Sequence, residues 1–178
     1  IRHTINETKE SIWIAQREGR AKDSNDRTQG SVLKMLNMSG DKDIVSNIMD
    51  LNIFPVAISY EYDPCDFLKA KEFQMKRDDP NYVKSQRDDL LSMETGILNN
   101  KGRVHFTLTQ PINDQLAALD KDMEKNELIA AIANIIDKEI YKHYRFYPCN
   151  YVAYDMLTGT KRFNSNYGLR DKKHFEEY

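Results

Sequence analysis

Apolar residues follow more than one pattern along the chain, and each pattern predicts a different element. Two short stretches, 11–15 and 53–58, are apolar without alternation and rich in strand-forming residues. Continuous apolar runs of this length indicate strands that are covered on both faces, as in a parallel or mixed sheet. Further on, Val104, Phe106 and Leu108 alternate with polar residues. That period of two predicts a strand with one face in the core and one wetter face.

Helical spacing of apolar residues marks the regions around these strands. Segments 31–36 and 44–51 have apolar residues at helical spacing, and a longer amphipathic helix begins after Asn126. The apolar stripe of that helix comprises Leu128, Ile129, Ile132, Ile135, Ile136 and Ile140. We expect this stripe to pack on the sheet, because amphipathic helices usually cover cores. Asp63-Pro64 and Asp79-Pro80 are interpreted as the entries of two further helices.

Strands that alternate with helices predict an α/β fold with a mixed, mostly parallel sheet flanked by helices. The 178 residues suit one domain or most of one. We expect residues 1–142 to form the main domain and residues 143–178 to be an aromatic-rich extension packed on it. The first residue is Ile1 rather than Met, so we expect further residues before it and a sheet that is incomplete at the N-terminus. Trp13, Phe54 and Val56 are expected in the core.

Charge and cysteine usage exclude several functional classes. The chain has 26 Lys and Arg against 28 Asp and Glu, a net charge of −2, so nothing favours nucleic acid as a partner. It contains no apolar run of about 18 residues, so we expect no membrane span. Cys65 and Cys149 lie far apart and outside metal-binding motifs. We therefore expect two unrelated thiols and no metal site.

The polar segment from residue 16 to residue 30 is the strongest candidate for chemistry. Four cations lie within it: Arg17, Arg20, Lys22 and Arg27. Ligands of open α/β sheets bind beyond the carboxyl ends of strands, and the arginine fork fits phosphate or carboxylate. Gly19 would let the backbone approach a ligand closely. A solvated loop of paired charges is the second interpretation, since three carboxylates balance most of the cations: Glu18, Asp23 and Asp26.

Three segments of the chain, in their order along the sequence, resemble conserved blocks of the glycerol-phosphate acyltransferase family. Glu18-Gly19-Arg20 after an expected strand is similar to that family's third block, Phe-Pro-Glu-Gly-x-Arg. Segment 53–58 is similar to its fourth block, Val-Pro-Val-Ala-Ile, with Pro55 in the proline position. Segment 103–112 is similar to the next strand of the family, which commonly ends in a Pro-Ile pair. The resemblance covers roughly residues 2–140. It departs from the family in the third block, where Arg17 replaces proline and Arg20 follows Gly19 directly.

The resemblance implies transfer of a fatty acyl group in phospholipid biosynthesis. The donor would be acyl-CoA or acyl carrier protein, and the acceptor the hydroxyl of glycerol 3-phosphate or of 1-acylglycerol 3-phosphate (lysophosphatidate). The expected substrate-binding residues are Arg17, Glu18, Gly19, Arg20, Lys22 and Pro55. No bound cofactor is implied. The family's His-x-x-x-x-Asp block, which supplies the general base, is absent from the chain and expected before Ile1. The chain alone should then be an inactive part of an acyltransferase, with no catalytic residue of its own.

Several alternatives stay open at this point. The acyl chain of the thioester donor is hydrophobic, so the resemblance implies a reaction at a membrane surface. We therefore expect a cytoplasmic protein that attaches peripherally to the inner face of the membrane through upstream residues. Contact with the acyl chain is a second interpretation for Trp13, Phe54 and Val56. Glu61, just after the fourth block, is an open candidate for the site. The chain could instead be a non-catalytic binding protein that kept the acyltransferase fold, or an enzyme that acylates another alcohol or amine.

Overall fold

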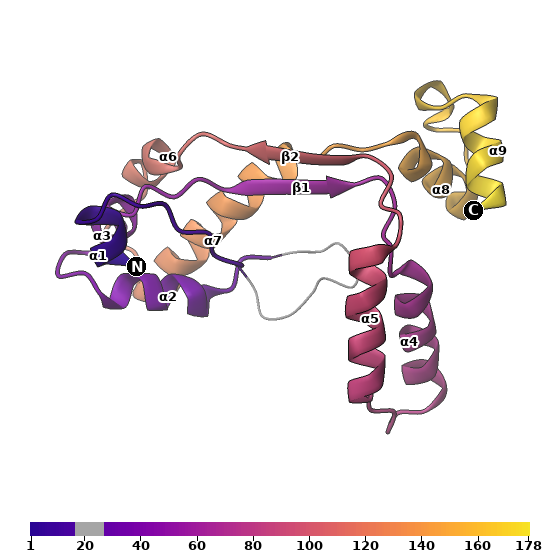
Figure 1. The fold of residues 1–178 in the computed structure, drawn as a ribbon. Coiled ribbons are helices and arrows are strands. Elements are labelled where there is room, and N and C mark those ends of the chain that lie inside the picture. The colour runs from indigo at the N-terminus through magenta and orange to yellow at the C-terminus, as the bar shows by residue number, and fades with distance from the viewer. Residues whose placement is uncertain (17–26) are drawn as a thin grey trace. The chain divides into compact units, whose positions relative to one another are not determined.

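The computed structural model describes residues 1–16 and 27–178 of the chain (Figure 1). Within that part, helices predominate and the strands form one two-stranded sheet. The elements in chain order are α1 (Arg2–Asn6), α2 (Gly30–Met38), α3 (Ile44–Met49), β1 (Val56–Tyr60), α4 (Asp66–Asp78), α5 (Gln86–Leu98), β2 (Val104–Leu108), α6 (Asn113–Ala117), α7 (Lys125–Lys142), α8 (Pro148–Thr158), the 3-10 turn η1 (Asn164–Asn166) and α9 (Leu169–Glu177).

Strands β1 and β2 pair antiparallel, which contradicts the mostly parallel sheet that we predicted. The backbone N–H of Glu61 donates to the Arg103 carbonyl at 2.9 Å, and that of Thr109 donates to the Pro55 carbonyl at 3.0 Å. A parallel pair needs a crossover that returns the chain to the start of the first strand. Helices α4 and α5 instead run in opposite directions and bring the chain back to the end of β1 that it left (Figure 1). The alternation of strands and helices was therefore misinterpreted as an α/β fold.

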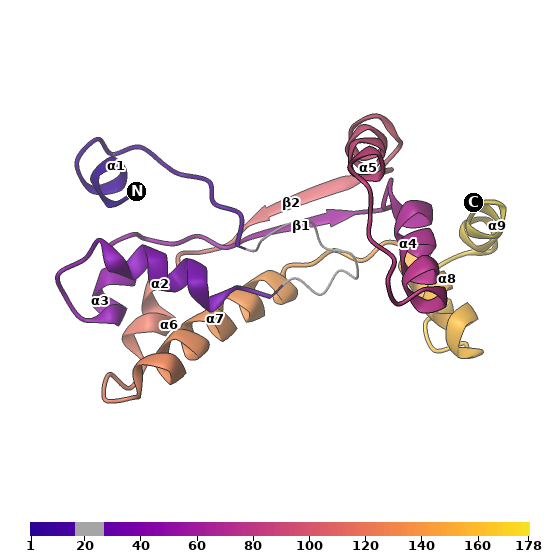
Figure 2. The same ribbon diagram turned by 90° about the horizontal axis from the view of Figure 1, so that it is seen from below.

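The described chain divides into two compact units, which are described separately. Unit 1 comprises residues 1–57 and 107–144. In it α2 contacts α3 and α7, and α6 contacts α3 and α7 (Figure 2). Its most deeply buried side chains include Leu33, Val45, Ile48, Ile112, Leu116 and Ile132. The predicted stripe on α7 is confirmed, with most of its residues buried, but α7 packs against α2 and α6 rather than across a large sheet.

Unit 1 departs from the sequence prediction at its first expected strand. Residues 11–15 form no strand, and the Trp13 side chain is 69% exposed. Phe54 is also exposed, while Val56 is half-buried, so the prediction that all three lie in the core is wrong. A strand satisfies its backbone groups only by pairing with a neighbour. In the described part of the chain, no strand pairs with residues 11–15.

The faces of the sheet also differ from the prediction. Val104, Phe106 and Leu108 are exposed, whereas His105 and Thr107 between them are half-buried. The register places Ile58 opposite Phe106, so the apolar residues of both strands share one face. The alternation correctly located the strand, but it could not tell which face other elements would cover.

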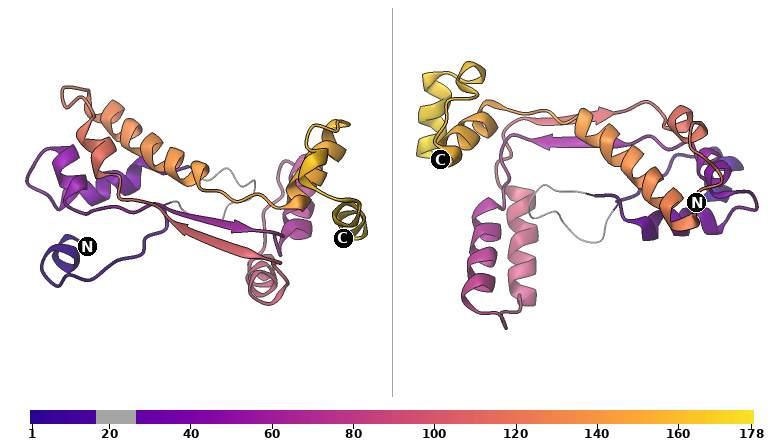
Figure 3. Two further views of the ribbon diagram at one scale, coloured as in Figure 1. Left: turned by 90° about the horizontal axis from the view of Figure 1, so that it is seen from above. Right: turned by 180° about the vertical axis from the view of Figure 1, so that it is seen from behind.

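Unit 2 comprises residues 58–106 and 145–178. Helices α4 and α5 lie side by side, and α8 contacts both η1 and α9 (Figure 3). Helix α5 begins at Gln86, because Ser85 and Asp88 form a reciprocal capping box there. Asp79-Pro80 lies in the connection between α4 and α5, so the predicted helix entry at that position is wrong. The proposed domain boundary between residues 142 and 143 remains a prediction.

Candidate functional site

A pocket in unit 1 lies on the polar side of α7. Seven residues of α7 recur three or four positions apart and therefore share one helical face: Asn126, Ala130, Ala133, Asn134, Asp137, Lys138 and Tyr141. Ile129 of α7 also lines the pocket, and Gly30 and Lys34 of α2, with Arg27 and Thr28 just before it, line the opposite side. The pocket has a volume of about 640 Å³ and is open to solvent.

Gly30 determines how closely α2 approaches α7 at this pocket. A Cβ atom added at Gly30 would lie 3.2 Å from the Cγ2 atom of Ile129. That distance is shorter than an ordinary van der Waals contact, so the Ile129 side chain would have to shift to accept an alanine at Gly30.

Asp137 ties the end of the charged segment to the pocket. Its Oδ1 atom accepts hydrogen bonds from the Thr28 backbone N–H at 2.8 Å and from the Thr28 hydroxyl at 2.7 Å. The backbone N–H of Gln29 donates to the carbonyl of Gln16 at 3.2 Å. Gln16 and Thr28, which flank the charged segment, are therefore held together at α7.

Among the described residues that line the pocket, cations outnumber carboxylates. Arg27, Lys34 and Lys138 contribute three cations, and Asp137 contributes one carboxylate. Lys34 Nζ donates to the side-chain oxygen of Asn126 at 3.1 Å, which holds the ammonium group over the pocket. An anion is favoured here, because it would offset the excess positive charge and accept hydrogen bonds from these donors.

Most of the predicted site residues cannot be placed on this pocket. Arg17, Glu18, Gly19, Arg20 and Lys22 lie outside the described residues. Pro55 is described: it is buried just before β1, and its carbonyl accepts the Thr109 bond. It does not line the pocket. The structure therefore gives Pro55 a place in strand pairing rather than at this site.

Sequence reasoning missed Lys34, Asn126 and Lys138. The sequence prediction gave the polar face of α7, which holds Asn134, Asp137 and Lys138, no role in a site. A signal was present in the spacing, since Ala130 and Ala133 place two small side chains in the middle of that face. Small residues between polar ones leave room for a neighbour or a ligand, but only the position of α2 shows which.

Glu61, the other open candidate for the site, belongs to an ion pair in unit 2. Its carboxylate accepts from the Arg103 guanidinium at 2.8 and 3.0 Å and from the Arg103 backbone N–H at 2.9 Å. The Arg103 guanidinium also lies 4.9 Å from the centre of the Tyr147 ring. The hydrogen bonds from the Arg103 side chain are the main cause that holds the pKa of Glu61 below its ordinary value. The lowered pKa keeps the Glu61 carboxylate ionised, as expected of a structural ion pair.

Acid should weaken unit 2 through this pair. A carboxyl group whose pKa is lowered in the folded state stabilises that state at pH values above its ordinary pKa of about 4.3. This stabilisation is lost as the pH falls through the lowered pKa. In Arg103→Gln the Glu61 pKa should rise toward the ordinary value, as measured by NMR titration of the carboxyl carbon. Arg145→Ala is the matched control, because Arg145 also lies over Tyr147 but makes no bond to Glu61. An unchanged Glu61 pKa in Arg103→Gln would contradict this assignment.

The thiol of Cys149 lies in the same region and is also a structural group. It donates to the Glu61 carbonyl at 3.0 Å. Burial, the main cause, raises the pKa of Cys149, which keeps the thiol protonated at neutral pH. A nucleophilic cysteine needs the opposite shift.

No group of three or more His, Cys, Asp or Glu side chains in residues 1–16 and 27–178 is arranged to hold a metal ion. Of the helices in those residues, none has both the length and the apolar composition needed to cross a membrane. Comparisons with family models, with curated proteins and with solved structures find no match to the chain.

Proposed function

We propose that this chain is the phosphate- and acyl-binding part of an acyltransferase. The reaction moves a fatty acyl group from acyl-CoA or acyl carrier protein to the hydroxyl of glycerol 3-phosphate or 1-acylglycerol 3-phosphate. The observation that carries the proposal is the positive pocket lined by Arg27, Lys34 and Lys138 beside the ends of the charged segment. A phosphate group bound there would complement the net charge of the lining and use its amide and ammonium donors.

The pairing of two sequence blocks supports the same proposal. Segments 53–58 and 103–112, which both resemble blocks of the acyltransferase family, are direct neighbours along the sheet. Their pairing extends beyond the strands, since the Ile112 backbone N–H donates to the Ile53 carbonyl at 3.1 Å.

The chemistry assigns binding and positioning to this chain. In the reaction the acceptor oxygen forms a bond to the acyl carbon and the carbon–sulfur bond breaks. A base takes the hydroxyl proton, and the thiolate of the donor leaves. The proposal assigns that base to a His-x-x-x-x-Asp block, which residues 1–178 do not contain. Holding the phosphate fixes the hydroxyl near the base, and positioning of this kind is worth several kcal/mol.

Removing either lysine of the pocket should weaken phosphate binding about tenfold, the loss expected when one hydrogen bond to a charged group disappears. Lys34→Ala and Lys138→Ala are the variants, glycerol 3-phosphate is the ligand, and isothermal titration calorimetry is the measurement. Lys142→Ala is the matched control, because Lys142 lies on the same helix outside the pocket. Glycerol without phosphate should not bind. Equal affinity in all three lysine variants would overturn the pocket assignment.

A second measurement separates binding from catalysis. With the whole natural reading frame expressed, Arg20→Ala should strongly raise the concentration of glycerol phosphate needed for acyl transfer. Phosphate binding without any acyl transfer would instead support the non-catalytic binding protein. Competition between glycerol 3-phosphate and an amine acceptor in one assay tests the third interpretation.

A further inference from the structure

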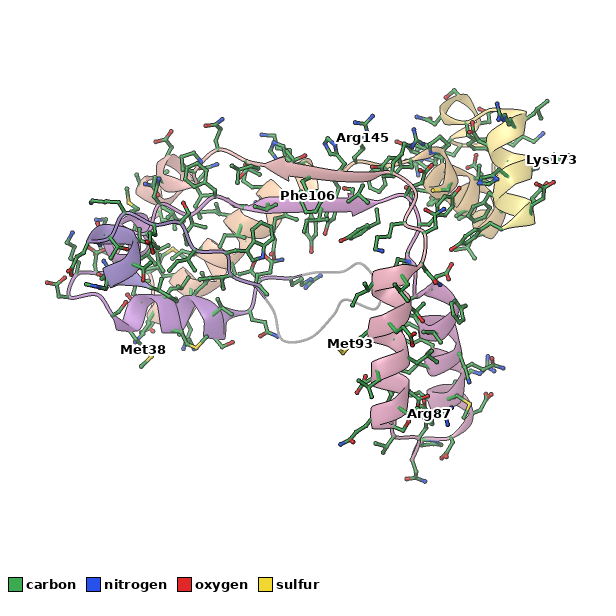
Figure 4. The ribbon with its side chains drawn as sticks, in the orientation of Figure 1. Met38, Arg87, Met93, Phe106, Arg145 and Lys173 are labelled. Carbon is green, nitrogen blue, oxygen red and sulfur yellow. The ribbon has the colours of Figure 1, made fainter. Side chains whose placement is uncertain are left out.

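Helix α5 buries its polar side and exposes its apolar side. Ser92 and Thr95 are buried, and a Cβ added at Gly96 would lie 3.4 Å from the sulfur of Cys65. The Cys65 thiol donates to the Ser92 carbonyl at 3.3 Å, so small and polar residues form the contact between α4 and α5. Five apolar side chains are 46–73% exposed and form what we call the α5 apolar face: Leu90, Leu91, Met93, Ile97 and Leu98. Figure 4 shows Met93 projecting from the side of α5 that faces away from α4.

The spacing of this face is that of a helix that packs on a partner. Residues 87, 90, 91, 94, 97 and 98 follow the i, i+3, i+4, i+7 pattern of one amphipathic side, and Met93 borders it. A helix normally turns this side to its own core. Here the side facing α4 is already occupied by polar and small residues, so no helix of unit 2 covers the apolar face.

Two opposite charges lie within the α5 apolar face. Arg87 and Glu94 are seven residues, about two turns, apart on the same side of the helix. Neither takes part in an ion pair with any described residue. Their midpoint falls between Leu90 and Leu91. If a second α5 is placed antiparallel about that midpoint, Arg87 of each copy faces Glu94 of the other.

We propose that the α5 apolar face is the interface of a homodimer. Two copies of α5 pack antiparallel about a twofold axis, Leu90 and Leu91 meet their counterparts near that axis, and two Arg87–Glu94 pairs flank them. A twofold interface uses the same patch on both copies, and the spacing of Arg87 and Glu94 makes this face complementary to itself in charge. The proposal is independent of the proposed function.

The charges of the α4–α5 hairpin favour a protein partner over a lipid surface. Residues 66–98 contain six basic side chains, Lys69, Lys71, Lys76, Arg77, Lys84 and Arg87. They contain seven acidic ones, Asp66, Glu72, Asp78, Asp79, Asp88, Asp89 and Glu94. Amphipathic helices that bind membranes carry a basic excess, because anionic lipids attract it. This hairpin has none.

Sedimentation velocity over a range of concentrations tests the interface. The unchanged chain should dimerise, and Leu90→Asp should yield monomers that retain the circular dichroism of the parent. Met38→Asp is the matched control: Met38 is an equally apolar, exposed residue at the end of α2, and its replacement should leave the dimer intact. Leu91→Cys should give a disulfide-linked dimer under oxidising conditions, since Cys65 and Cys149 are buried.

A charge swap tests the antiparallel register. Arg87→Glu and Glu94→Arg alone should each raise the dimer dissociation constant by about tenfold or more, because like charges then face each other. The double variant should return to within about threefold of the parent, since the swap restores both pairs. Singles that match the parent, or a double variant no better than the singles, would overturn this register. A monomeric parent chain whose binding to phosphatidylglycerol vesicles is lost in Leu90→Asp would assign the face to a membrane and overturn the proposal.

Discussion

Replacing Asp155 with alanine should loosen the C-terminal helices at a cost of about 3 kcal/mol, the loss expected when several buried donors lose one charged acceptor. The Asp155 carboxylate is buried on α8. It accepts from the Phe163 backbone N–H at 3.0 Å, the Tyr167 hydroxyl at 3.0 Å and the Thr160 hydroxyl at 3.1 Å. One side chain thus ties the turn after α8, η1 and the approach to α9 to a single point.

Hydrogen exchange measures this effect where it should occur. Amides of α8, η1 and α9 should exchange faster in Asp155→Ala, while those of unit 1 should keep their protection. Asp155→Asn should be milder, because an amide oxygen can still accept part of the set. Asp78→Ala is the control, since Asp78 is exposed and pairs only with its neighbour Arg77. If the amides of α8, η1 and α9 exchanged at the same rates in Asp155→Ala and in its parent, the anchoring role would be refuted.

Gly40→Ala should destabilise unit 1 by about 3 kcal/mol, near the upper range of single substitutions. A Cβ at Gly40 would lie 2.0 Å from the side-chain oxygen of Asn47, far inside any tolerated contact. Asn47 is buried and cannot simply turn away. Its amide donates to the Asn37 side chain and the Lys42 carbonyl, both at 2.8 Å, and its oxygen accepts from the Lys42 backbone N–H at 3.1 Å. Either these bonds break or the turn between α2 and α3 moves.

A double-mutant cycle isolates the clash. Asn47→Ala alone should also destabilise, because it leaves the Lys42 backbone groups without their partner. Once Asn47 is truncated, however, Gly40→Ala should add almost nothing, so the two effects should be strongly non-additive in urea unfolding. Gly168→Ala is a control, since a Cβ there would lie 3.6 Å from its nearest neighbour. Additive costs would show that Gly40 matters for another reason.

The helices illustrate what local sequence could predict. Segments 31–36 and 44–51 were predicted as helices. The first lies within α2, and the second largely coincides with α3. The stripe that begins at Leu128 correctly identified the buried side of α7. These predictions succeeded because a helix satisfies its backbone within one segment and its periodicity is visible in that segment. The prediction that a helix begins at Asp79-Pro80 was wrong, because α5 begins after the capping box at Ser85.

The strands illustrate where local sequence fails. Residues 11–15 have the composition of a strand but no partner among the described residues, whereas 104–108 pair with β1. Composition also could not distinguish an antiparallel strand pair from a parallel pair joined by a crossover, so the prediction of an α/β fold was wrong. Pairing direction and covered face depend on segments far apart in sequence, which no local pattern encodes.

The candidate site divides along the same line. The sequence by itself determined where the cations concentrate, that segments 31–36 and 44–51 form helices, and which side of α7 is apolar. Only the tertiary structure decided that the polar side of α7 faces Lys34 and Arg27 across a pocket, that Glu61 is committed to Arg103, and that α5 turns its apolar side outward. The physical reason is that charge and periodicity are local properties of a segment, whereas a pocket, an ion pair or an uncovered face exists only once distant segments have packed.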